Sequence, residues 1–432
     1  MITMETSVIT ESRCPFTDRA SHAESDEATA PAAAESTVRV GAALNLPVAD
    51  WVEVEQLRID PYPTYARLRE ESPVVWVPSI KKVLVASFSG CLFGEQHPDI
   101  FSNDVSGAHM TQAFGGQPMI RKDGAAHSAE RSVINPTLRP KKIAQVWEQR
   151  FRSNADTYLD ALEAAGSGAD LNEVFAAPLA AKNLIDLLGL TGVSPTDLAR
   201  WSADFIAGAG NVLGNEDIWL RCRRSRAEVD AALDEALPRL RKNADDSITS
   251  LLLHGGMPLE SVRANVILAI SGGVNEPQHI TTSTVSLLTQ HPEHLAWAQA
   301  DPKNFAHIFQ ETVRFQSPIG MVTRETKTST EIDGFQIPAG SQIGLLVASA
   351  NRDATKFEDP DRFNPRRSER RHLGFGSGNH ICAGKWAAET AIGNIAVPAL
   401  YERFPQLSTD PASPGVWDGW AFRGFKSLPV IW

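Results

Sequence analysis

The feature that most constrains this chain is the stretch from Phe375 to Gly384, which reads Phe-Gly-Ser-Gly-Asn-His-Ile-Cys-Ala-Gly. Its closely spaced glycines allow backbone conformations that other residues avoid. An alanine-rich run follows, so Cys382 is expected where this loop becomes a helix. The N-terminus of a helix offers unpaired N–H groups and the positive end of its dipole, and both favour a thiolate over a thiol. The stretch therefore predicts a site in which Cys382 acts as a thiolate ligand.

The other cysteines suggest no competing role. The chain has 432 residues and four cysteines, at positions 14, 91, 222 and 382, without a Cys-x-x-Cys pair. This spacing predicts neither a zinc cluster nor a disulfide framework, and it fits a cytoplasmic protein. Among cofactors that take a single cysteine, haem is the leading candidate. The alternative is a buried structural cysteine beside an ordinary glycine turn.

The decapeptide resembles the haem-binding loop of the cytochrome P-450 family. Phe375, Gly378, Cys382 and Gly384 match the defining positions of that loop, and His380 stands two before the cysteine. The resemblance implies the cytochrome P-450 fold, mainly α with a smaller β region. It also implies a haem-thiolate monooxygenase that binds haem b (iron protoporphyrin IX) through Cys382. Three loop residues would lie against the cofactor, namely Phe375, Gly376 and Gly384.

Composition and charge limit what the rest of the chain can be. The net charge of −11 lacks the basic footprint of nucleic-acid binding. No apolar run approaches the roughly 18 residues of a membrane helix, so no membrane association is predicted. Residues 1–45 are poor in large apolar groups, which predicts a disordered N-terminal tail. Residues 46–432 are predicted to form one domain, with a hairpin over 74–86, helices over about 139–315 and more strands over 328–347.

Two groups of residues outside the loop extend the resemblance. Glu311 and Arg314 lie three apart, hence on one helix face, and match the core helix of the family. By resemblance they form a buried structural ion pair, and losing one partner would cost about 3–5 kcal/mol. The resemblance also implies four residues that hold the haem propionates, namely His127, Arg131, Arg324 and His380. In isolation, His127 and Arg131 fit a solvated helix face equally well.

The predicted helix from Leu259 to Gln290 departs from the family pattern at its centre. The family has an acid and a threonine that relay protons there, whereas this chain has Asn275 and Glu276. We predict this pair to be catalytic, with Glu276 as proton donor because burial should raise its pKa toward the working pH. Pro277 lacks an N–H and should open the helix. The alternative is that Glu276 pairs with a cation. Two small residues precede the pair and would lie against the cofactor, namely Gly272 and Gly273.

The amide-glutamate-proline sequence resembles that of the bacterial P-450 enzymes that demethylate guaiacol and syringol. The C-terminal segment 417–429 resembles that subgroup too. The resemblance implies O-demethylation of lignin-derived methoxyphenols (guaiacol, syringol or alkylguaiacol) to catechols and formaldehyde, with dioxygen and supplied electrons. The segment 204–211 has mostly small residues, which would widen the pocket for a second ring substituent. The substrate pocket would be lined by Phe422, Phe114, Ile319, Val322, Ile270, Gly273 and Ala209.

Two other functional classes stay open on the sequence alone. One is another haem-thiolate enzyme, either a hydroxylase of a small apolar substrate such as a terpene or macrolide, or a peroxide-driven peroxygenase. The other is a haem sensor or carrier, which would not need the unusual sequence around Glu276.

The chain must receive its electrons from elsewhere, because it contains no flavin, nicotinamide or iron–sulfur motif. The predicted partner is a separate NAD(P)H-dependent reductase with a flavin, an iron–sulfur cluster or both. A basic run before the cysteine loop would attract an acidic partner. Its members are Arg366, Arg367, Arg370 and Arg371. The alternative is a solvated run of charge partly balanced by Glu369.

Overall fold

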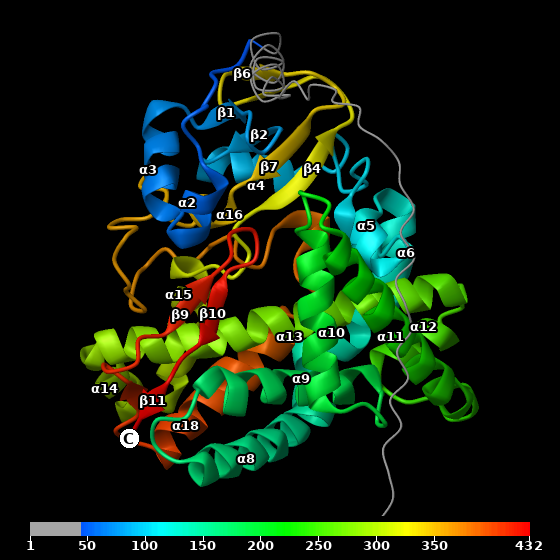
Figure 1. The fold of residues 1–432 in the computed structure, drawn as a ribbon, viewed down its shortest axis with the longest axis vertical. Helices are drawn as coiled ribbons and strands as arrows, with labels where there is room; N and C mark the ends of the chain where they lie inside the picture. Colours follow the sequence, from blue (N-terminus) through cyan, green and yellow to red (C-terminus); the bar gives the residue numbers. More distant parts are fainter. Residues whose placement is uncertain (1–44) are drawn as a thin grey trace, which may run out of the picture.

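The computed structural model describes residues 45–432, which fold into a large helical body and a smaller sheet region (Figure 1). The predicted class, mainly α with a smaller β region, is confirmed. The predicted tail over residues 1–45 lies, apart from Asn45, outside the described residues. No helix within residues 45–432 is long and apolar enough to cross a membrane.

The sheet region gathers strands from distant parts of the chain. The main sheet has the strand order β1-β2-β7-β4-β3. β1 and β2 form the predicted hairpin, β2 and β7 are parallel, and the other pairs are antiparallel. The second predicted strand region also contains a separate hairpin of β5 and β6. The bounds are β1 Val74–Val77, β2 Lys82–Val85, β3 Phe101–Ser102, β4 Val322–Thr326, β5 Thr330–Ile332, β6 Phe335–Ile337 and β7 Gln342–Leu345.

The helical body is built around α13 (Leu259–Gln290), whose bounds match those predicted for the long helix. α13 contacts α9 (Ala177–Leu188) and α10 (Pro195–Ala209) within one large apolar core. α9 comes close to α13 because Gly273 has no side chain. A Cβ atom there would lie 2.8 Å from Leu184 Cδ1.

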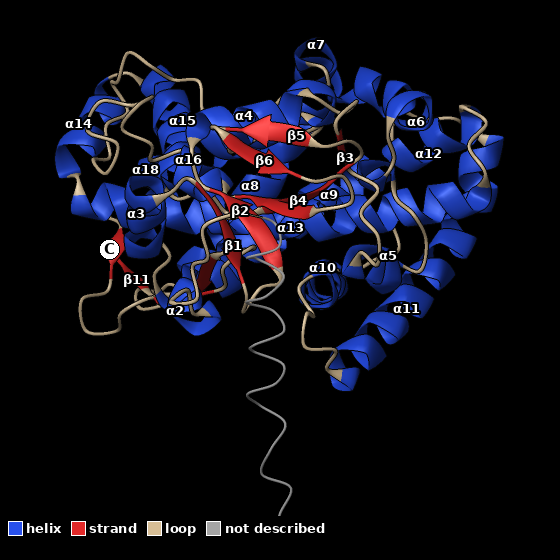
Figure 2. Cartoon of the chain, turned by 90° about the horizontal axis from the view of Figure 1, so that it is seen from above, coloured by secondary structure: helices blue, strands red, loops and turns tan. Residues whose placement is uncertain are grey.

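The other helices surround this centre. Their bounds are α2 Val54–Ile59, α3 Tyr62–Glu71, α4 Phe88–Gln96, α5 His109–Phe114, α6 Gly124–Ile134, α7 Pro140–Lys142, α8 Glu148–Ala165, α11 Glu216–Lys242, α12 Ile248–His254, α14 Pro292–Ala300, α15 Phe305–Phe315, α16 Val347–Ala350, α17 Lys385–Ala388 and α18 Val397–Arg403. A π-helical stretch, Glu389–Ala396, joins α17 to α18. In Figure 2 the main sheet crosses the middle of the view, with α14 and α15 on one side and α6, α11 and α12 on the other.

The C-terminal segment folds back toward the sheet region as a hairpin, drawn in red in Figure 1. The hairpin consists of β9 (Val416–Asp418) and β10 (Gly424–Ser427). Below it, β8 (Ser408–Thr409) pairs with β11 (Val430–Ile431). At the tip, Ile319 and Phe422 form an isolated antiparallel bridge. The fold therefore brings together two of the residues predicted to line a substrate pocket.

Candidate active site

The loop from Phe375 to Gly384 is closed on itself and packed against α4. The Cys382 N–H donates to the Phe375 carbonyl oxygen at 2.8 Å. Gly378 has a φ of 64°, and a Cβ atom there would lie 2.7 Å from the Glu95 carbonyl oxygen. Only glycine meets both conditions without strain. The loop is thereby held against α4, and Cys382 stands just before α17 begins.

The electrostatics around Cys382 differ from the sequence expectation. Cys382 has accessible surface, but desolvation by the protein atoms around it still raises the pKa of its thiol, and the N–H groups of Gly384 and Lys385 lower it only in part. The Glu276 carboxylate raises this pKa further, and the charge of Arg131 lowers it. The helix N-terminus therefore does not overcome desolvation, and the protein alone favours the thiol. A bound metal ion deprotonates a coordinating thiol outright and would reverse this preference.

Four residues predicted to bind propionate groups gather beside the cysteine loop. The rings of His127 and His380 stack with their centroids 3.9 Å apart. Arg131 Nη2 donates to the Ile381 carbonyl oxygen at 2.6 Å. Burial, with help from His127 and Arg324, lowers the pKa of His380 to about 3. At neutral pH the positive charge of this group therefore resides mainly on its two arginines.

Arg121 joins this group, although the sequence reasoning did not select it. Burial lowers the pKa of Arg121 to about 10, and the charge of Arg324 adds to this effect. The Arg121 Nε atom is buried and has no hydrogen-bond partner among the described residues. Arg121 lies in a short 3-10 turn outside every motif, so no spacing marks it. Buried cations with free donor atoms, next to a cysteine ligand, fit the carboxylates and the iron of haem.

The centre of α13 carries buried polar atoms without partners. Glu276 Oε2 and Asn275 Nδ2 have no hydrogen-bond partner among residues 45–432. Burial raises the pKa of Glu276 to about 8, so its carboxyl group is mostly protonated at neutral pH. Gly272 lies on the same helix face, where a Cβ atom would be 3.6 Å from Glu276 Oε1. Glu276 also raises the pKa of the Cys382 thiol, so the two groups lie within electrostatic range of each other.

The alternative prediction for this region, a structural ion pair, does not describe the arrangement. Within the described part of the chain Glu276 forms no ion pair. Pro277 does not end the helix, which continues to Gln290. Glu276 therefore keeps a buried carboxyl oxygen without a partner among the described residues.

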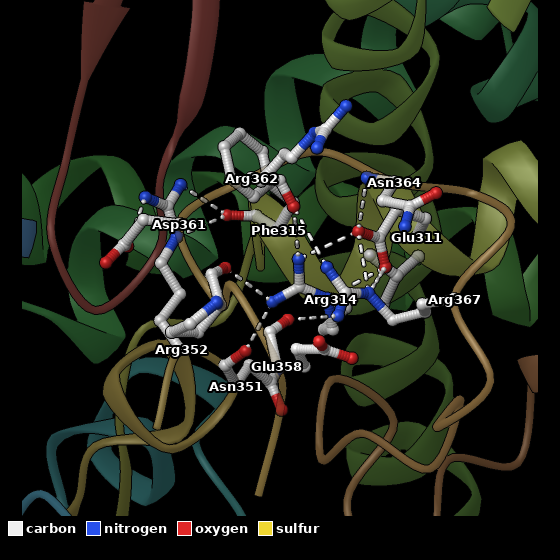
Figure 3. Close-up of polar contacts among 12 residues, drawn as sticks. Glu311, Arg314, Phe315, Asn351, Arg352, Glu358, Asp361, Arg362, Asn364 and Arg367 are labelled. Carbon is white, nitrogen blue, oxygen red and sulfur yellow. Dashed lines mark hydrogen bonds and ion pairs between the residues drawn. The ribbon is translucent and has the colours of Figure 1, made fainter. Parts of the chain in front are cut away.

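Glu311 and Arg314 belong to a buried network in which each charge has a partner (Figure 3). Arg314 Nε and Nη2 donate to the two Glu311 carboxylate oxygens, each at 2.8 Å. Arg367 Nε donates to the same two oxygens, each at 3.0 Å. The other N–H groups of the two arginines bind carbonyl groups of the chain before the cysteine loop, those of Asn351, Glu358, Pro360 and Arg362. The network therefore fastens α15 to that segment.

Comparisons with known proteins agree with this geometry. Residues 306–404 match the family model for Cytochrome P450. The chain is 30% identical to linalool 8-monooxygenase of Pseudomonas putida, over 76% of this chain and 85% of that protein. It is 28% identical to cytochrome P450 monooxygenase PikC of Streptomyces venezuelae, over 86% of this chain and 91% of that one. The chain belongs to the cytochrome P450 family.

Solved structures show the same fold. The structure of P450BioI with an acyl carrier protein ligated to hexadec-9Z-enoic acid has a TM-score of 0.80 at 22% identity and covers 88% of this chain and 100% of that one. CYP108D1 from Novosphingobium aromaticivorans has a TM-score of 0.76 at 25% identity and covers 87% and 94%. The predicted cytochrome P450 fold and the haem b cofactor are confirmed. This P450 is a monooxygenase that takes electrons from a separate redox partner.

One predicted role in this P450 is wrong, that of Arg367 in a docking surface. A Cβ atom on Gly273 would meet Leu184 of α9, so Gly273 permits helix packing, and its place against the cofactor or the substrate stays a prediction. Successive helix residues point about 100° apart, and Gly272 alone of the two lies on the face of Glu276. Arg367 is 8% exposed and bonded to Glu311, so it cannot belong to a docking surface. The other members of the basic run are exposed, namely Arg366, Arg370 and Arg371.

The predicted substrate residues fall into two groups. Ile319 and Phe422 are paired at the tip of the C-terminal hairpin, and Val322 begins β4 close by in the chain. All three are partly exposed.

The second group lies in the helical body. Phe114 is buried, and its ring meets that of Phe205 edge-on with centroids 5.7 Å apart. Ile270 is buried on α13, and Ala209 ends α10. The sequence reasoning passed over Phe205 because most of its neighbours are small. The Phe205 ring packs against α5, so the predicted widening of the substrate pocket depends on the other residues of the segment 204–211.

Proposed function

We propose that this P450 O-demethylates methoxyphenols of the guaiacol, syringol or alkylguaiacol type, with Glu276 as the proton donor. The observation that carries the proposal is a buried carboxyl oxygen of Glu276 without a partner among the described residues, at the centre of α13 and close enough to Cys382 to raise the pKa of its thiol. Asn275 beside it has a free amide donor. The amide-glutamate-proline sequence at this place resembles that of the guaiacol and syringol O-demethylases.

The residues that would hold haem follow from the same geometry. Cys382 would bind the haem iron as a thiolate. Bound haem supplies the activation of dioxygen and the oxidation of a C–H bond. The loop and helix residues against the ring would be Phe375, Gly376, Gly384 and Gly272. The propionate groups would be held by His127, Arg131, Arg324, His380 and, as the structure adds, Arg121.

The reaction inserts one oxygen atom into a C–H bond of the methoxy group. Dioxygen, two electrons from the reductase and two protons give one water molecule and a hydroxymethyl ether. The ether then loses formaldehyde and leaves a phenolic hydroxyl, so guaiacol becomes catechol. Glu276 would deliver a proton from its carboxyl group, which stays mostly protonated at neutral pH because its pKa is about 8.

The chain would orient the aromatic ring through apolar contacts rather than charge. Phe422 and Ile319 would pack on the ring from the hairpin tip, where their backbones are paired. Ile270 and Phe114 would close the side formed by the helices, together with Val322 and Ala209. With the aromatic ring covered by these apolar contacts, the methoxy carbon would be the part of the substrate that is open to oxidation.

A hydroxylase of a small apolar substrate is the second candidate. The observation that favours it is the 30% identity to linalool 8-monooxygenase, whose name gives a terpene alcohol as substrate. Apolar pocket residues such as Ile319 and Ile270 would suit a terpene as well as an aromatic ring. A peroxide-driven reaction is a variant of either function, since Glu276 could also donate a proton to peroxide.

We also propose a docking site for the redox partner on the exposed arginines before the cysteine loop. Arg366 lies over the Trp297 ring at 4.7 Å, and Arg370 Nη1 contacts His307 Nδ1 at 2.8 Å. Arg371 is exposed beside them. An acidic reductase or ferredoxin would be attracted to these three positive charges and repelled by the rest of the surface, because the net charge of the chain is −11.

The substrate class is tested by titrating the ferric protein with guaiacol, syringol, 4-alkylguaiacols and linalool while recording its optical spectrum. The proposal predicts a shift to high-spin iron with the methoxyphenols and formaldehyde release once a surrogate reductase is added. A shift with linalool alone, without formaldehyde from any methoxyphenol, would favour the terpene hydroxylase instead.

A further inference from the structure

Glu95, at the end of α4, is a buried carboxylate that bridges two parts of the haem site. Its side chain has contacts in two directions and the residue is 5% exposed. Oε1 forms an ion pair with Arg324 Nη2 at 3.0 Å. Oε2 accepts a hydrogen bond from the Ser377 N–H at 3.0 Å. One side chain thus connects an arginine of β4 to the loop that carries Cys382.

The loop packs directly against this end of α4. Gln96 Nε2 donates to Ser377 Oγ at 3.1 Å. A Cβ atom on Gly376 would lie 3.1 Å from Glu95 Oε2, and one on Gly378 would lie 2.7 Å from the Glu95 carbonyl oxygen. The loop could not rest on Glu95 in this way with larger residues at those positions. The position of the loop and the position of Glu95 therefore depend on each other.

Glu95 is also the anion within a group of cations. Arg324 Nη1 donates to the carbonyl oxygen of Thr323, an uncharged partner. Arg121 and Arg131 lie in the same region, and within residues 45–432 neither forms an ion pair with a carboxylate. Removing the charge of Glu95 would leave Arg324 without its ion-pair partner.

We propose that Glu95 is a positioning residue that connects propionate-binding Arg324 to the cysteine loop. Its negative charge would also partly neutralise the positive charge that the arginines place near the haem. The proposal rests on the assignment of Arg324 and Cys382 to the haem. Positive charge near haem favours the reduced iron, so the charge of Glu95 lowers the reduction potential. Its two hydrogen bonds hold both haem-binding elements in one arrangement, as outer partners of metal ligands commonly do.

The proposal is tested on the holoprotein with Glu95→Gln and Glu95→Asp. The glutamine variant loses the charge and one of the two acceptors. We expect its midpoint potential to rise and its haem to transfer to apomyoglobin about tenfold faster. The aspartate variant keeps the charge but has a shorter reach. We expect a potential near that of the wild type, with faster haem loss.

Asp353→Asn is the matched control, because it removes a buried carboxylate at the other end of the same helix. Asp353 Oδ2 accepts a hydrogen bond from the Phe88 N–H at 2.7 Å. This control should lower the melting temperature without moving the potential. If Glu95→Gln changes only the melting temperature, as the control does, Glu95 is merely a structural residue and the proposal fails. Glu95→Gln could lose its haem during purification, and the midpoint potential of Glu95→Asp is then compared with that of Arg324→Gln. If the two variants differ from the wild type by the same amount, the charge retained in Glu95→Asp has no effect and the proposal fails.

These measurements use no methoxyphenol. They therefore fail or succeed independently of the proposed O-demethylation.

Discussion

Two buried acidic groups of this P450 have opposite surroundings. Glu311 accepts four hydrogen bonds from Arg314 and Arg367 and a further one from the Asn364 N–H. Glu276 has a carboxyl oxygen with no partner among the described residues, and burial raises its pKa to about 8. Buried polar groups in proteins are normally paired, and exceptions concentrate at functional sites. The contrast agrees with a stabilising role for the network around Glu311 and with the proposed proton transfer by Glu276.

Removal of Glu311 is expected to have the largest effect. Glu311→Gln would leave Arg314 and Arg367 without their anion in a buried site, at a cost of about 3–5 kcal/mol. We expect little folded holoprotein, measured by haem content and thermal unfolding. Glu55→Gln is a matched control, since Glu55 and Arg58 have the same spacing but side chains that are 64% and 51% exposed. It should leave unfolding unchanged, and equal effects of the two variants would contradict the assignment.

Glu276→Gln is expected to lower turnover without lowering stability. Loss of a general acid costs about 10²-fold or more in rate. Formaldehyde release from the preferred methoxyphenol should fall by this factor, while haem content and substrate-induced spin shift persist. A variant with wild-type turnover would show that Glu276 is not the donor.

The pH dependence sharpens the same contrast. The pKa of Glu276 is raised from 4.5 to about 8, so the folded state binds the proton more tightly than the unfolded state does. The stability associated with this proton is fully present below pH 4.5 and is lost as pH rises through about 8. Denaturant unfolding of the wild type should weaken over this window by up to about 1.4 kcal/mol per pH unit relative to Glu276→Gln. Parallel pH profiles of the two proteins would contradict the burial of a protonated carboxyl group.

The two neighbouring glycines of α13 separate packing from function. Gly273→Ala would bring a Cβ atom to 2.8 Å from Leu184, and such overpacking costs about 1–3 kcal/mol. Gly272→Ala would place a Cβ atom 3.6 Å from Glu276, an ordinary contact on the side of the proposed active site. We therefore expect the first variant to lower the melting temperature and the second to change the spin shift with guaiacol. The reverse result would place the haem on the other face of α13.

The smallest effect is expected from the exposed arginines. Combined replacement of Arg366, Arg370 and Arg371 by Gln should slow electron transfer from the native partner about tenfold at low ionic strength. The difference should shrink with added salt, because screening weakens steering. Stopped-flow reduction measures this, with replacement of the exposed Arg150, Arg223 and Arg224 as the control. If the rate of reduction by the native partner is unchanged, these three arginines do not form the docking site.

Local signals in the sequence predicted the frame of the site. The glycine pattern around Cys382 and the apolar period of α13 act over short stretches, and both describe the structure well. Glu95, Arg121 and Arg367 were missed or misassigned, because their partners are distant in the chain. The pairing of β4 with β7 and the packing of α4 on the loop bring Glu95 to Arg324. No spacing in the sequence encodes such a contact.

Side-chain direction was the other limit of the sequence. Gly272 and Gly273 are chemically identical, and only the folded structure shows that a Cβ atom would meet Glu276 at the first and Leu184 of α9 at the second. For Cys382 the helix N-terminus was recognised, but the desolvation by surrounding protein atoms, which outweighs it in setting the pKa, depends on the whole fold.

The most direct test of the central claim is the stoichiometry of turnover with guaiacol and syringol, for the wild type and for Glu276→Gln. Dioxygen consumption, formaldehyde and the demethylated product are measured together with a surrogate reductase. The account predicts one formaldehyde per demethylated ring in the wild type, with both products reduced about 10²-fold in the variant. Oxygen consumption without formaldehyde from either substrate, or equal yields from the two proteins, would contradict it.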